Sequence, residues 1–231
     1  MNGGEVHPRK ITSEIFQVGG SGFTSSDDAA VYLIVQGDGA ALVDAGSGRG
    51  HDRLIQAVRA CGVNPEAIRY LLLTHCHYDH TGGACRLRDE TGCLTIMHEL
   101  EAPYLEGGDN SVTAADWYDA SITPCPVDIK LTGAISPITL EGMDITAYHT
   151  PGHSPGSVAY VTESDGITVL FGQDVHGPLH PSLLSMESDY IQSLKRLLEL
   201  DADILCEGHY GIYEGKDKVR AFIETYLREY E

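Results

Sequence analysis

The sequence predicts an α/β fold in which two β-sheets pack against each other, with helices on their outer faces. Short segments of alternating or continuous apolar residues, typical of strands, recur together with longer segments of helical periodicity. They form two successive halves of the chain, and neither a linker nor a repeat period separates the halves. Hydrophobic residues make up 42% of the 231 residues, so a substantial core and one domain over residues 1–231 are expected.

The first half begins with a predicted β-meander, followed by a helix. Three strands are expected, over residues 14–18, 30–36 and 40–44. The glycine-containing turn at residues 37–39 joins the second strand to the third. A helix is expected over residues 51–61, and Gly62 stands where a left-handed helix end is expected.

The next segments lead to a polar strand end. Asn64-Pro65-Glu66 opens a short helical turn, with proline at its first helical position. Residues 68–73 are apolar enough to form a strand buried on both faces. The segment LLLTHCHYDHTGG, residues 71–83, runs from the end of that strand into a helix through Glu90.

Residues 94–128 are less regular, and regular elements return after them. A short strand and helices around residues 98–105 and 113–120 are expected in this region. Later strands are expected over residues 138–140, 143–149, 157–162, 167–171 and 204–206. The last helices are expected over residues 190–200 and 216–230.

Four side chains of metal-ligand type lie within six residues at the end of strand 68–73. His75 and His77 are two residues apart, so both can point to one side and bind one cation through imidazole nitrogen. Asp79 and His80 follow as the chain turns and can face a neighbouring position. Histidines can also cap or solvate a turn, but so tight a cluster behind a buried strand favours a metal site.

Three further candidate ligands follow later strands. His153 lies in HTPGHSPGS, Asp174 in LFGQD and His209 in ILCEGHYG. Any one of them alone would fit a capping or solvated residue. All three occur in the same context, beside glycines that let the backbone approach closely, and this coincidence favours completion of the site.

These motifs resemble those of the metallo-β-lactamase superfamily. The resemblance rests on T-H-x-H-x-D-H-T-G-G, P-G-H-S-P-G-S, G-x-D and the final G-H, and extends from the V-D-A-G loop at Asp44 to His209. It is closest to the glyoxalase II-like branch of hydroxyacylglutathione hydrolases and related lactonases. The resemblance implies a four-layer αβ/βα sandwich with a two-metal site in a groove at one edge.

The resemblance also implies a role for each ligand-type residue. The first metal is held by His75, His77 and His153. The second metal is held by Asp79, His80 and His209. Asp174 bridges the two metals, and Asp44 orients ligands without being one.

This ligand set implies hydrolysis of a thioester, lactone or related ester. Two cations about 3.5–4 Å apart can share a hydroxide that attacks a polarised carbonyl, so no nucleophilic serine or cysteine is needed. Zinc is the expected metal, and iron or manganese also suits nitrogen and carboxylate ligands. We assign catalytic roles to Asp79 and His176. His176 and Tyr210 are the nearest candidate proton donors, and hydrogen bonding around the ligands is the alternative role for both.

The substrate is expected to be a small molecule. Residues 210–231 suffice for one helix rather than for the helical domain with which related glutathione-thioester hydrolases bind glutathione. The region 94–128 is therefore expected to line the groove. There Tyr104, Trp117 and Tyr118 would either contact an apolar substrate or pack in the core.

Three other functions stay open. Persulfide-oxidising relatives keep the same motif around one iron, so a sulfur dioxygenase is the main alternative. A non-catalytic metal-binding protein would be favoured by broken ligands, and none of the seven is broken. RNA processing occurs in the superfamily, but the net charge of −19 and the lack of a basic stretch oppose a nucleic-acid partner.

The remaining features bear on compartment and partners. No apolar run approaches the roughly 20 residues of a membrane span, and MNGGEVHPRK lacks the apolar core of a secretion signal, so a cytoplasmic location and no membrane partner are expected. The six cysteines are scattered without a C-x-x-C pair and are expected to be buried or free thiols. A homo-oligomer is compatible with this composition.

Overall fold

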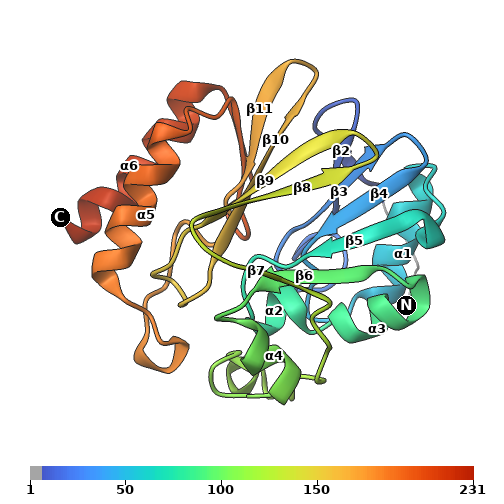
Figure 1. Ribbon diagram of the computed structural model, residues 1–231, viewed down its shortest axis with the longest axis horizontal. Helices are drawn as coiled ribbons and strands as arrows, with labels where there is room; N and C mark the ends of the chain where they lie inside the picture. The colour runs from blue at the N-terminus through green and yellow to red at the C-terminus, as the bar shows by residue number, and fades with distance from the viewer. Residues whose placement is uncertain (1–6) are drawn as a thin grey trace.

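The computed structural model describes residues 7–231 and contains two β-sheets packed face to face, with helices on both outer sides (Figure 1). The first half of the chain forms a seven-stranded sheet and the second half a six-stranded sheet within the described residues. This arrangement confirms the predicted four-layer α/β sandwich. The segment MNGGEVHPRK, in which no secretion signal is expected, includes residues 1–6, and these lie outside the described residues.

The first sheet contains its strands in chain order. These are β1 (Arg9–Lys10), β2 (Ile15–Gly19), β3 (Val31–Gln36), β4 (Gly39–Val43), β5 (Ile68–Leu72), β6 (Leu94–His98) and β7 (Ile129–Leu131). Strands β1 to β4 pair antiparallel, whereas β4 to β7 pair parallel. The connections contain α1 (His51–Ala60), η1 (Pro65–Ala67), α2 (Tyr78–Thr81), α3 (Ala84–Thr91), α4 (Ala102–Gly107) and η2 (Ala115–Tyr118). Parallel pairing places the carboxyl ends of β4, β5 and β6 at one edge.

The second sheet has one parallel pair. Its strands are β8 (Ile135–Leu140), β9 (Met143–His149), β10 (Val158–Ser164), β11 (Ile167–Phe171), β12 (Ile204–Cys206) and β13 (Ile212–Glu214). Only β11 and β12 run parallel, so their carboxyl ends also meet at one edge. The outer side carries η3 (Pro181–Leu183), α5 (Glu187–Glu199) and α6 (Lys216–Tyr230), and α5 and α6 pack together beside the sheet (Figure 1).

The core between the sheets also positions the strand ends. The aromatic rings of Tyr32 on β3 and Phe171 on β11 lie 5.6 Å apart across the interface. The Tyr160 hydroxyl donates to the carbonyl of Leu73 at 2.9 Å, and the Tyr32 hydroxyl donates to the carbonyl of Glu207 at 2.8 Å. Each buried tyrosine thus satisfies its polar atom on a segment that leaves the opposite sheet.

Some element boundaries differ from the predicted ones. His98 completes β6 by pairing with Leu131, so the helix expected from residue 98 begins only at Ala102. The helix expected over residues 113–120 is the single turn η2. Strand β5 is not buried on both faces, because Arg69 is exposed. Strands β1, β7 and β13 span two or three residues each, too few to show a periodicity.

The expectations for the cysteines are confirmed. All six are free thiols, and four of them are buried. Cys76 and Tyr78, which alternate with the candidate ligands, point into the core beside the first sheet. Among residues 7–231, none of the helices has the length and apolar character needed to cross a membrane.

Asp128 joins three elements of the first half. Arg88 of α3 donates two hydrogen bonds to its carboxylate, at 2.8 and 3.1 Å, and the backbone and hydroxyl of Thr95 on β6 each donate one at 2.9 Å. The Arg88 bond, helped by Thr95 and opposed by partial burial, lowers the pKa of Asp128 to about 2. These bonds hold the segment before β7 against α3 and β6.

We expect Asp128→Asn to lower the free energy of unfolding by about 1–2 kcal/mol at pH 7, because the charge-assisted bonds are lost. The folded-state pKa lies below the unfolded value of about 3.9, so this difference is full above that value and is lost as the pH falls toward 2. Urea unfolding of the variant and of the unsubstituted protein at pH 7 and pH 3 measures this difference in the free energy of unfolding. The exposed Asp38→Asn serves as control, and equal stability of both variants would contradict the assignment.

Candidate metal centre

The seven candidate ligands lie where strands of both sheets end. His75 and His77 follow β5, and Asp79 and His80 lie in α2 directly after them. The other three lie after β9, β11 and β12: they are His153, Asp174 and His209. Segments far apart in the sequence therefore meet between the open edges of the two sheets.

The structure brings these side chains into two adjoining groups. Ligand atoms of the first group all lie within 4.8 Å of one another and belong to His75, His77, His153 and Asp174. A second group with the same spacing comprises Asp79, His80 and His209. The same spacing also groups Asp174 with His176 and His209, so Asp174 adjoins both groups.

The two oxygens of Asp174 face different groups. Oδ2 lies 3.3 Å from Nε2 of His153 and 3.8 Å from Nε2 of His75. Oδ1 lies 3.2 Å from Nε2 of His80 and 3.4 Å from Nε2 of His209. One carboxylate therefore contacts histidines of both groups, which is the arrangement a shared ligand requires.

The hydrogen bonds of His80 and His75 leave their inner nitrogens free. Nδ1 of His80 lies 2.6 Å from Asp44 Oδ2, so this nitrogen carries the proton. Nδ1 of His75 lies 3.0 Å from the Thr74 hydroxyl, which itself donates to Asp44 Oδ2 at 2.8 Å. The Nε2 atoms of both histidines are buried without a hydrogen-bond partner. Buried ring nitrogens that lack a hydrogen-bond partner fit a metal ion.

The ring nitrogens of His153 and His77 are also positioned by close contacts. Nδ1 of His153 donates to the Pro178 carbonyl at 2.8 Å, so Nε2 is the nitrogen left for a ligand contact. That Nε2 lies 3.0 Å from Nδ1 of His77. Burial, reinforced by neighbouring histidines, holds the pKa of both His75 and His77 well below the ordinary value. His75 and His77 therefore offer neutral imidazoles, the form that binds cations.

The carboxylates in and beside the second group favour positive charge on its histidines. Burial opposes it, but the carboxylates of Asp174, Asp79 and Asp44 raise the pKa of His80 well above its ordinary value. Asp174 and Asp79 likewise raise the pKa of His209 to about 10 against the effect of burial. Burial also opposes ionisation of Asp174, yet His80 and His209 hold its pKa well below the usual range. A divalent cation can replace these protons, so the donor set fits a metal at this position as well.

Asp44 accepts hydrogen bonds from several residues around this centre. It has no exposed surface, and its φ of 63° turns the chain sharply at the end of β4. Oδ1 accepts the backbone N–H of Thr74 at 2.8 Å. Oδ2 accepts His80, the Thr74 hydroxyl and the amide of Gln173, the last at 2.6 Å. Asp44 lies outside both ligand groups and orients members of each.

Two buried glutamates, which the sequence analysis did not identify, tie the ligand loops together. Glu101 accepts the backbone N–H of Cys76 at 2.9 Å and that of Gly156 at 2.7 Å. Glu207 accepts Nδ1 of His176 and the backbone N–H of His209, both at 2.7 Å. Glu207 stands directly before the G-H motif, so the sequence offers a reason to consider it as part of the site. No local sequence pattern marks Glu101.

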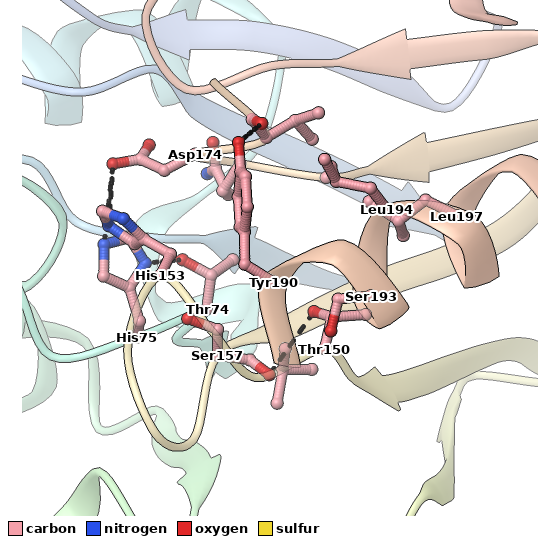
Figure 2. A pocket seen from close by; sticks show the side chains of 14 residues that line it. Thr74, His75, Thr150, His153, Ser157, Asp174, Tyr190, Ser193, Leu194 and Leu197 are labelled. Atoms are coloured by element: carbon pink, nitrogen blue, oxygen red, sulfur yellow. Dashed lines mark hydrogen bonds and ion pairs between the residues drawn. The ribbon is translucent and has the colours of Figure 1, made fainter. Parts of the chain in front are cut away.

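Helix α5 closes the back of the centre. A cavity of about 30 Å³ lies between α5 and the first ligand group. Figure 2 shows Tyr190 of α5 beside this cavity, with His75, His153 and Asp174 on one side of the ring and Leu194 on the other. The Tyr190 hydroxyl donates to the carbonyl of Val175 at 2.5 Å. A side chain at Gly152, whose φ is 130°, would lie 2.1 Å from the Tyr190 nitrogen, so the loop to His153 requires glycine there.

A larger cavity of about 290 Å³ opens in front of the ligands. Its lining includes His176 and Tyr210, both proposed from the sequence as proton donors, and Trp117 and Tyr118 from η2. Tyr104, the third aromatic residue expected in the groove, is absent from this lining and packs against the core instead. The region 94–128 thus lines the groove only through its second part.

The comparisons with known proteins agree with the motifs. A family model described as the metallo-beta-lactamase superfamily matches residues 27–209. A "Probable metallo-hydrolase" of Bacillus subtilis is 29% identical over 77% of this chain and 79% of that protein. An acyl-coenzyme A thioesterase of Gallus gallus is 27% identical over 95% of this chain and 85% of the thioesterase. A hydroxyacylglutathione hydrolase of Anaeromyxobacter dehalogenans is 33% identical over 57% of this chain and 41% of the hydrolase.

Solved structures resemble this one in fold. The native metallo-beta-lactamase of Legionella gormanii superimposes with a TM-score of 0.80 at 19% identity, covering 97% of this chain and 94% of that one. At this identity the likeness concerns the arrangement of sheets and helices alone.

We expect Asp44→Asn to weaken metal binding by roughly 10–100-fold, the usual effect of losing a residue that orients ligands. An amide cannot accept all four hydrogen bonds, so His80 and His75 lose their fixed orientation. Competition with a chromophoric chelator measures the affinity. The exposed His180→Ala, beside the cavity but outside both groups, should bind metal normally. Unchanged affinity of Asp44→Asn with an intact circular dichroism spectrum would contradict this role.

Proposed function

This chain belongs to the metallo-beta-lactamase superfamily, and we propose that it is a hydrolase that uses two divalent cations, zinc in the first place, to cleave a thioester, lactone or related ester. The observation that carries the proposal is the position of Asp174, whose two oxygens face separate groups of histidines. A site for a single cation would need only one of these groups.

The proposed ligands divide between the two cations as the structure groups them. The first cation would be held by His75, His77 and His153, and the second by Asp79, His80 and His209, with Asp174 shared. When bound, such cations polarise a carbonyl and lower the pKa of water to near neutrality. The chain itself provides buried, pre-oriented nitrogens, which limit reorganisation on binding.

His176 is the proposed proton donor to the leaving group. Its Nδ1 lies 2.7 Å from the fully buried Glu207 carboxylate, which fixes the proton on that nitrogen and the plane of the ring. The ring lines the large cavity, so Nε2 remains for exchange with a substrate there. Tyr210 is the second candidate, since it also lines the cavity and packs edge-on against His176 at 4.8 Å.

Asp79 is a proposed ligand of the second cation and also lines the large cavity. Its Oδ2 lies 3.1 Å from Nε2 of His209. Burial and the nearby Asp79 carboxylate raise the pKa of Tyr118, so the phenol keeps its proton beside the site. The relatives support the reaction class, because one is described as an acyl-coenzyme A thioesterase and another as a hydroxyacylglutathione hydrolase.

We expect zinc-loaded protein to cleave a thioester or lactone without oxygen, because Lewis acidity needs no redox change. Asp174→Ala should lower kcat/KM by more than about 100-fold while keeping the fold, since this residue lies beyond the end of β11. Anaerobic assays against a panel of esters measure both effects, with the exposed Asp144→Ala as control.

A sulfur dioxygenase gives the opposite result in the same experiment. The zinc form would be inert towards every ester, and only the ferrous form would consume oxygen with a persulfide. Loss of His209 would then matter little, because one iron is sufficient. That outcome would overturn the proposed hydrolysis.

A further inference from the structure

The residues that line the large cavity in front of the ligands fall into two chemically different sets, here called its walls. One wall consists of ligand residues together with His176. The other wall is apolar and aromatic, and its main members are Ala114, Trp117, Pro178 and Leu183. The volume of about 290 Å³ lies at the small end of ligand pockets, which span roughly 300–1,000 Å³. A substrate in this cavity would therefore contact both the reacting groups and apolar side chains.

Exposed apolar side chains gather around this cavity. Of the eight large hydrophobic residues that are exposed within residues 7–231, four lie on segments that line the cavity or adjoin its lining: Trp117, Leu184, Met186 and Tyr210. The indole of Trp117, 52% exposed, packs edge-on against His180 at 5.4 Å, which joins η2 to the loop before η3. A local cluster of exposed apolar surface at a groove is typical of a ligand-binding site.

Lysine and arginine side chains are missing from the lining. The nearby Arg49 donates to the carbonyl of Tyr118 at 2.8 Å and pairs with Asp27, so its charge is already engaged. The whole chain carries a net charge of −19. Phosphate and carboxylate groups are normally bound by arginine or lysine, and neither is provided here.

We propose that this cavity selects an ester or thioester with an apolar acyl chain and an uncharged leaving group, and that Trp117, Pro178 and Leu183 contact the acyl chain. This inference rests on the proposed hydrolase function and narrows it. It separates this chain from the relatives named above, because coenzyme A carries phosphates and glutathione carries carboxylates. The cavity lining offers no lysine or arginine to the anionic groups of either leaving group.

Binding can be followed without catalysis, because Trp117 is the only tryptophan of the chain. Non-cleavable thioethers serve as probes: S-octyl N-acetylcysteamine, S-octyl coenzyme A and S-octyl glutathione, each titrated into metal-loaded protein. The uncharged probe should shift the indole emission to shorter wavelength and bind at least tenfold more tightly than either anionic one. Shortening its chain should weaken binding by about two- to fourfold for each methylene removed.

Two variants test the apolar wall by activity. Trp117→Ala should raise KM for an octanoyl thioester of N-acetylcysteamine by at least tenfold and reduce the preference for octanoyl over acetyl. Ile135→Ala removes an equally exposed apolar side chain on β8, outside the cavity lining, and should leave both values unchanged. Equal effects of the two variants would overturn the role of Trp117.

The outcomes separate this inference from the proposed function. Tighter binding or faster cleavage of the coenzyme A or glutathione compound would overturn the inference and leave the hydrolase intact. Tight binding of the uncharged probe, with no ester of any kind cleaved by the metal-loaded protein, would support the cavity's selectivity and overturn the hydrolase.

Discussion

The Asp44 carboxylate is the constraint on which the candidate centre depends. It is fully buried, and it accepts four hydrogen bonds from three segments: the end of β5, helix α2 and the loop after β11. These bonds fix the tautomer of His80 directly and that of His75 through Thr74. A buried carboxylate with four hydrogen-bond donors is stable only if all four donors stay in place. Asp44 therefore fixes the ligand loops of the two sheets relative to each other.

The fold explains why such a centre forms at this edge. Parallel pairs occur in both sheets, β4 with β5 and β11 with β12, and their carboxyl ends are the places where loops can carry polar residues without breaking a ladder. Buried tyrosines of the core bind the carbonyls of Leu73 and Glu207 across the interface. Glu101 and Glu207 then link neighbouring loops, so the ligands are positioned by packed elements rather than by flexible chain.

Much of the fold could be predicted because the strands that matter most are strongly apolar and end in polar motifs. The HCHYDH segment could be proposed as part of a metal site for the same reason, since His75, His77, Asp79 and His80 occupy four of its six positions. Glu101 was missed because its partners, Cys76 and Gly156, are distant in sequence and bond through backbone atoms. His98 was placed in a helix because β6 gains its last pair from Leu131, a contact that no local pattern shows. Tyr104 illustrates the ambiguity of aromatic residues, which suit both a groove and a core.

The site is proposed to hold two cations that share the Asp174 carboxylate, and a crystal of zinc-loaded protein tests this proposal most directly. Anomalous scattering at the zinc edge should give two peaks per chain, about 3.5–4 Å apart, one beside each histidine group and both beside Asp174. A single peak beside His75, His77 and His153, with the second group still bound to protons at saturating zinc, would contradict the account.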